Sequence, residues 1–275
     1  MSKIRVPKRD EQVDVARTIY WFACLRLRLG TDKPREIQRI VAPETVGLDP
    51  RNEPIKNNKF LGYSKGEHVP NSNLVQRAAR LSPRSAQALE HPLWKVLRAK
   101  GSIRKMASQW IRQLDREIQG VALGHFNDVV TGANRHTLGA LERRAGLDSL
   151  AALTILLKLR HEESQPECAW LYALSIFRVL LIIGPELDQH EVAEKVFDLY
   201  VQRVFGLASI NQQRIDLATY PYMLMTDLLE RLVVNVIQKS SEERSSTYYA
   251  LGILNGVYKS RLHSLFEIPV TPAQT

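Results

Sequence analysis

Positively charged side chains are concentrated in one window of this 275-residue chain. Between Asn71 and Leu114 there are nine Lys and Arg residues and a single acid, Glu90. A polyphosphate carries condensed counterions, and each Lys or Arg that displaces one gains favourable entropy. Arg also holds a phosphate through two parallel hydrogen bonds. The window therefore predicts a surface that binds the phosphates of a nucleic acid.

The predicted phosphate-binding residues extend upstream into a glycine- and proline-rich segment. Three lysines lie there beside Phe60 and Tyr63, aromatic residues that could stack on unpaired bases. The alternative for these two rings is a role as small hydrophobic anchors, which is the commoner role for loop aromatics. The complete predicted set is Lys56, Lys59, Lys65, Arg77, Arg80, Arg84, Lys95, Arg98, Lys100, Arg104, Lys105 and Arg112.

The charge of the whole chain has the same bias. The 38 Lys and Arg residues exceed the 29 Asp and Glu residues, giving a net charge of +9. Residues 1–120 hold 24 of the cations against 12 acids, whereas residues 121–275 are slightly acidic. Such a division suggests different partners for the two halves. We expect nucleic acid, either DNA or RNA, on the first half and other protein subunits on the helices of the second.

Two other partners fit a basic surface. An acidic protein would make the chain a scaffold or interaction protein, and carboxylates of the second half could neutralise part of the window. Membrane headgroups fit less well, because no basic amphipathic helix with an exposed bulky apolar face is evident. We therefore expect no membrane partner.

Patterns that would indicate an enzyme are weak. His125, Asp128 and His136 cluster in a glycine-bearing linker and could serve an enzyme that acts on a phosphorylated substrate. The His125 and Asp128 pair could also hold a metal, but a metal site needs at least a third ligand, and none lies at a familiar spacing. The sequence has no nucleophile elbow, phosphate-cradling glycine loop or dinucleotide fingerprint. We expect a non-enzymatic protein with no catalytic residue, cofactor or metal.

The elements that position these residues are predicted to be mostly α-helical. Helical spacing of apolar residues predicts helices over 11–29, 34–41, 73–81, 83–89, 92–98 and 102–118 in a basic N-terminal region of residues 1–120. An irregular segment interrupts that region at about 43–73. Residues 121–275 are predicted to form an all-helical bundle, with helices over 149–159, 169–183, 188–205, 222–239 and 246–259.

Three local patterns add detail to this prediction. Residues 137–154 superficially fit a helix-turn-helix, but the leucine-rich second helix leaves almost no polar face for bases and predicts a core helix. Gly184-Pro185 predicts a helix end. The best strand signal, at 265–270, is weak.

The sequence gives two indications of location. The apolar run 169–183 is 15 residues long, whereas a membrane span needs roughly 20, so it predicts a buried core helix. No secretory signal is evident, and two cysteines are too few for a disulfide scaffold. These observations predict a cytoplasmic protein.

Overall fold

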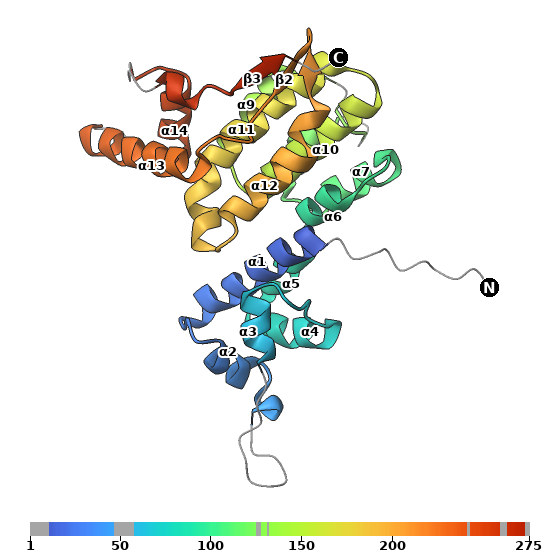
Figure 1. Cartoon of the computed structure of the whole chain (residues 1–275), viewed down its shortest axis with the longest axis vertical. Helices are drawn as coiled ribbons and strands as arrows, with labels where there is room; N and C mark the ends of the chain where they lie inside the picture. The colour runs from blue at the N-terminus through green and yellow to red at the C-terminus, as the bar shows by residue number, and fades with distance from the viewer. Residues whose placement is uncertain are drawn as a thin grey trace, which may run out of the picture. The chain divides into compact units, whose positions relative to one another are not determined.

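The computed structural model describes residues 11–46, 58–124, 128–130, 132–240, 243–258 and 263–272. It is mostly α-helical, as the sequence predicts (Figure 1). The chain divides into two compact units, described separately below. Unit 1 comprises Met1–Trp94 with Gln189–Val192, and unit 2 comprises Lys95–Asp188 with Ala193–Thr275. The predicted boundary at residue 120 falls inside unit 2.

Unit 1 is a cluster of short helices around a long first helix. The N-terminal helix ends where the sequence predicts: Gly30 has a φ of +66° and its N–H donates to the Arg26 carbonyl at 3.0 Å. Glycine adopts this left-handed conformation without the strain that a Cβ imposes. The helices are α1 (Glu11–Leu29), α2 (Pro34–Val41), η1 (Pro43–Thr45), α3 (Lys59–Ser64), α4 (Ser72–Leu81) and α5 (Pro83–Leu89).

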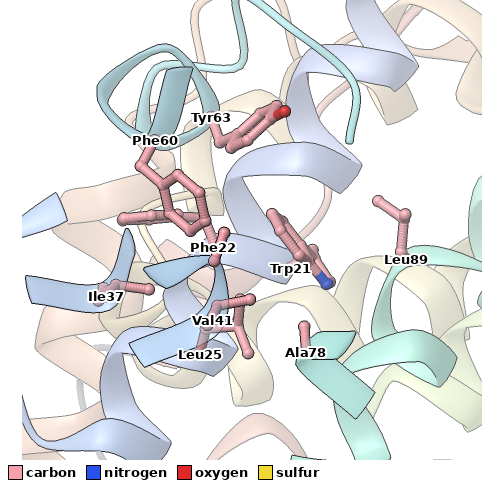
Figure 2. Close-up of a cluster of buried hydrophobic side chains, with 10 residues drawn as sticks. Trp21, Phe22, Leu25, Ile37, Val41, Phe60, Tyr63, Ala78 and Leu89 are labelled. Carbon is pink, nitrogen blue, oxygen red and sulfur yellow. The ribbon is translucent and has the colours of Figure 1, made fainter. Parts of the chain in front are cut away.

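The core of unit 1 is an aromatic and aliphatic cluster contributed by α1 to α5 (Figure 2). Trp21 is completely buried at its centre, and the Tyr63 ring meets it edge to face at a centroid distance of 5.8 Å. The predicted irregular segment at 43–73 thus contains α3, which supplies Phe60 and Tyr63 to this core. Residues 47–57 of that segment lie outside the described residues.

The boundary between the two units falls within helix α6 (Pro92–Arg98), between Trp94 and Lys95. In unit 2, several helices pack around one buried helix, α10 (Leu147–Glu162). In α10 every residue from Ser149 to Arg160 is buried, so the predicted core helix is confirmed and this helix cannot read bases. The helices of unit 2 are α7 (Arg104–Ile111), α8 (Arg116–Ala122), α9 (Arg135–Arg143), α10 (Leu147–Glu162), α11 (Pro166–Gln189), α12 (Ala193–Arg203), η2 (Phe205–Leu207), α13 (Tyr222–Lys239), α14 (Ser246–Leu254) and η3 (His263–Phe266).

The predicted helix end at Gly184-Pro185 is wrong. Helix α11 continues through Pro185 to Gln189 because it packs against the first turns of α13, where the Tyr222 hydroxyl donates to the Leu180 carbonyl at 2.8 Å and Thr226 lies against Gly184. Tertiary packing of this kind supports a helix through a residue that lacks an N–H. The helix predicted over 188–205 begins instead at Ala193, because Glu191 has a φ of +60° and lies in the turn after α11.

By length and composition α11 could cross a bilayer, and it is the one such helix in the described residues. Within its most apolar window, 61% is buried inside the protein. This burial agrees with the core position predicted for residues 169–183, since Tyr172, Ile176 and Leu180 are completely buried.

Unit 2 also contains a small antiparallel sheet, ordered β1-β2-β3, that the prediction of an all-helical bundle omitted (Figure 1). Asn211 and Gln212 both have positive φ, at 48° and 60°, and form the two-residue turn of the β1-β2 hairpin. The usual glycine signal for such a turn is missing from the sequence. The strands are β1 (Ser209–Ile210), β2 (Gln213–Ile215) and β3 (Val270–Pro272), so the weak strand signal at 265–270 coincides with a strand only at Val270.

Candidate nucleic-acid interface

The structure divides the predicted phosphate-binding residues between the two units. Lys56 lies outside the described residues. Unit 1 carries five of the others: Lys59, Lys65, Arg77, Arg80 and Arg84. Unit 2 carries the remaining six in one continuous stretch of chain: Lys95, Arg98, Lys100, Arg104, Lys105 and Arg112.

The unit 1 cations lie on α3, α4 and α5, except Lys65, which directly follows α3. Arg77 forms an ion pair with Glu44, and this hydrogen bond holds the pKa of the Glu44 carboxyl below its usual value. Arg80 and Arg84 are exposed, and neither side chain has a hydrogen-bond or ion-pair partner among the described residues. Unit 1 thus offers a short cationic surface on α4 and α5.

Base stacking by Phe60 and Tyr63 is excluded. Their relative exposures are 3% and 6%, and their rings contact each other edge to face in the unit 1 core (Figure 2). Burial raises the pKa of the Tyr63 hydroxyl. The anchoring role, which the sequence analysis left as the alternative, is the correct one.

The unit 2 cations lie on α6, on the turn after it and on α7. Residues 95–116 contain seven Lys and Arg residues and one acid, Asp115. Lys100, Lys105 and Arg112 are exposed and have no hydrogen-bond or ion-pair partner among the described residues. The other three predicted cations are engaged: the Lys95 ammonium donates to the Gln113 side chain at 2.7 Å, Arg104 lies 3.8 Å from the Glu163 carboxylate, and Arg98 also has an interaction partner.

The single helix predicted over 102–118 is wrong. It breaks into α7 and α8, because the Asp115 carboxylate caps the second helix by accepting from the Glu117 N–H at 2.8 Å. Met106 on α7 is 40% exposed. Ala107, Trp110 and Ile111 anchor α7 in unit 2, which leaves Lys105 and Arg112 on the exposed face.

A buried lysine from α10 fixes the turn between α6 and α7. The Lys158 ammonium donates to the carbonyls of Val96 and Ala99, at 2.9 and 2.7 Å. Arg203 donates to the neighbouring Leu97 carbonyl at 3.3 Å. These contacts satisfy carbonyls that the end of a helix leaves without intrahelical partners. Burial, together with the charge of Arg203, lowers the pKa of Lys158 to about 8.

An acid from the same helix holds the other side of the turn. The Glu162 carboxylate accepts from the Ser102 hydroxyl at 2.6 Å and from the Ile103 N–H at 2.7 Å. The turn that carries Lys100 is therefore bound at both ends by α10. This role of Lys158 and Glu162 was not predicted. A lysine inside the apolar run of α10 is nevertheless a detectable signal, because a lysine at a core position needs hydrogen-bond acceptors.

The His125, Asp128 and His136 group gains no support as a site. His125 lies outside the described residues, His136 is exposed at the start of α9, and the Asp128 carbonyl accepts from the Gly124 N–H at 2.7 Å. In the described part of the chain no three His, Cys, Asp or Glu side chains are grouped to hold a metal ion.

Comparison of the chain with protein-family models, with curated proteins and with solved structures finds no match in any of the three.

Proposed function

We propose that the chain is a non-enzymatic nucleic-acid-binding protein that holds phosphates through residues 95–116 of unit 2. The observation that carries the proposal is the excess of seven cations over one acid in this segment, with Lys100, Lys105 and Arg112 exposed and unpaired within the described structure. Each unpaired cation can replace a condensed counterion without first breaking an ion pair.

The way that α10 holds this segment supports the same function. Lys158 and Glu162 fix both ends of the turn that carries Lys100, so little conformational entropy is lost when phosphates bind there. The proposed contacts are made to phosphates, and a phosphate contact carries no sequence information. We therefore expect affinity with little sequence preference.

The cationic face of α4 and α5 in unit 1 is a second candidate contact. Arg80 and Arg84 are exposed and lack partners among the described residues, whereas Arg77 is held by Glu44. We expect Arg80 and Arg84 to add affinity and Arg77 to add less, because Glu44 already neutralises it.

The test is a salt titration of binding to fluorescent single-stranded and duplex oligonucleotides, about 20 nucleotides long, between about 50 and 200 mM salt. Replacing Lys100, Lys105 and Arg112 together by Ala should reduce the slope of log K against log salt by about two to three. The control replaces Arg135, Lys195 and Lys239, which are exposed on α9, α12 and α13. It removes the same charge and should change the slope little.

Two results would overturn the proposal. One is a wild-type protein that binds neither oligonucleotide at the lowest salt. The other is a Lys100, Lys105 and Arg112 variant whose affinity and slope equal those of the control. A wild-type protein that ignores nucleic acid but binds an acidic protein through these residues would assign the surface to the scaffold function instead.

A further inference from the structure

A cavity in unit 2 is separate in sequence from the cationic segment and has the opposite charge. It lies between α12 and the chain that leads into α13, with a volume of about 370 Å³. Residues Glu194, Phe197, Asp198 and Val201 form its α12 wall, at the three- and four-residue spacing of one helix face. The opposite wall runs from Leu217 to Leu224. Its size is in the range of small-molecule sites, about 300 to 1,000 Å³.

Aromatic rings give the cavity a fixed apolar surface. Phe197 and Tyr222 stack with their centroids 4.3 Å apart and an angle of 3° between the ring planes. The rings of Tyr220 and Phe177 meet edge to face, with their centroids 5.2 Å apart. The Tyr222 hydroxyl donates to the Leu180 carbonyl, so its ring is held from behind by α11. These contacts hold the aromatic walls in place before any ligand binds.

Two carboxylates provide the charge of the cavity. Glu194 and Asp198 are exposed and lie four residues apart on α12, where like charges repel. Neither carboxylate has a hydrogen-bond or ion-pair partner among the described residues, and no Lys, Arg or His lines the cavity. A bound positive charge would relieve this repulsion.

We propose that this cavity binds a small organic cation, a protonated amine joined to an apolar ring or branched hydrocarbon. The ammonium group would lie between Glu194 and Asp198, and the apolar body would lie against Phe197 and Tyr220. Ammonium groups are attracted both to carboxylates and to the faces of aromatic rings. A metal ion fits poorly, since two carboxylates beside apolar walls supply too few oxygen ligands. The negative charge disfavours phosphates and carboxylates.

Three ring compounds of similar shape test the charge requirement. Benzylammonium, benzyl alcohol and benzoate are titrated into the isotopically labelled wild-type protein while amide chemical shifts are recorded. Benzylammonium should shift the amides of α12 and of residues 217–224 in a saturable manner. Benzyl alcohol should bind more weakly, and benzoate should not bind.

Variants assign the binding to these residues. Glu194→Gln combined with Asp198→Asn should weaken benzylammonium binding by about tenfold, because two charge contacts are lost. Glu230→Gln combined with Glu243→Gln is the matched control, since it removes two exposed carboxylates outside the cavity. Ala218→Phe, which introduces a ring at an exposed lining position, should abolish binding by filling the space.

The proposal is overturned if benzylammonium produces no saturable shifts, or if benzyl alcohol binds equally well. It is also overturned if the Glu194 and Asp198 variant binds as tightly as the control. Thermal unfolding of each variant establishes that it is folded. These outcomes do not depend on nucleic-acid binding, because the oligonucleotide titration uses different residues.

Discussion

Lys158 and Glu162, one turn apart on α10, bind opposite ends of the same turn between α6 and α7. The ammonium meets the carbonyl end of α6, and the carboxylate meets the Ser102 hydroxyl and the Ile103 N–H directly before α7. Each charge therefore faces the pole of a helix dipole that it stabilises. One helix, itself buried, thereby sets the position of the proposed phosphate-binding turn.

Replacing Glu162 by Gln should loosen this turn. The charge-assisted bonds to Ser102 and Ile103 weaken, and we expect a loss of about 1 to 2 kcal/mol in the free energy of unfolding. Urea denaturation measures the loss, and hydrogen exchange of the Ile103 amide should become faster. Glu230→Gln on α13 is the control, since Glu230 is exposed and has no partner in the described chain. Equal stability of the two variants would show that the contact is unimportant.

Lys158 should make stability depend on pH. Its pKa is about 8 in the folded protein, against 10.5 for an ordinary lysine, because burial disfavours the charged form. Between these values the unfolded chain binds more protons than the folded one, so the free energy of unfolding rises as pH rises. Below about pH 8 both states are protonated and this contribution to the pH dependence disappears.

The measurement compares wild type with Lys158→Met between about pH 7 and 9.5, below the ordinary tyrosine pKa of about 10. We expect the wild type to gain stability relative to the variant by about 1 kcal/mol per pH unit at most. Parallel pH profiles for the two proteins would contradict this assignment of the pKa.

The buried pair Thr154 and Tyr200 predicts an asymmetry between two conservative substitutions. The Thr154 hydroxyl donates to the Leu150 carbonyl at 2.7 Å, so the Tyr200 hydroxyl must be the donor in their 2.6 Å contact. Tyr200→Phe leaves Thr154 with a partner and should cost about 1 kcal/mol. Thr154→Val leaves the completely buried Tyr200 hydroxyl without its acceptor and should cost about 2 to 3 kcal/mol.

Denaturant unfolding of the two variants distinguishes these values. The informative result is which variant loses more free energy of unfolding. A larger loss for Tyr200→Phe than for Thr154→Val would mean that Tyr200 is not the donor. The burial that raises the pKa of Tyr200 keeps the hydroxyl protonated throughout the measurement.

The same substitution at two glycines should have effects of opposite sign. A Cβ at Gly184 would collide with the Thr226 side chain, where α11 approaches α13. Gly184→Ala should therefore cost about 1 to 3 kcal/mol through overpacking. Gly120 in α8 faces open space, and Gly120→Ala should stabilise by about 0.5 to 1 kcal/mol because alanine is the better helix former. Thermal unfolding midpoints that move in the same direction would contradict this packing.

Local sequence patterns determined most of the helices. The spacing of apolar residues predicts α1, α2, α5 and α6 with their observed bounds, because an amphipathic pattern and a cap are read over a few neighbouring residues. Gly30 marks the end of α1 for the same reason. The excess of cations in residues 95–116 is likewise a property of the sequence alone.

Only the tertiary structure decided which residues are available and which are covered. Phe60 and Tyr63 resemble exposed loop aromatics in the sequence, but contacts with Trp21 make them core residues. Pro185 is a local stop signal that packing against α13 overrides. Lys158 and Glu162 contact the α6–α7 turn across about 60 residues of chain. The two walls of the cavity, α12 and residues 217–224, also come from separate segments, which lie closer together in the sequence. Such contacts depend on the packing of distant segments, which no local pattern of residue types contains.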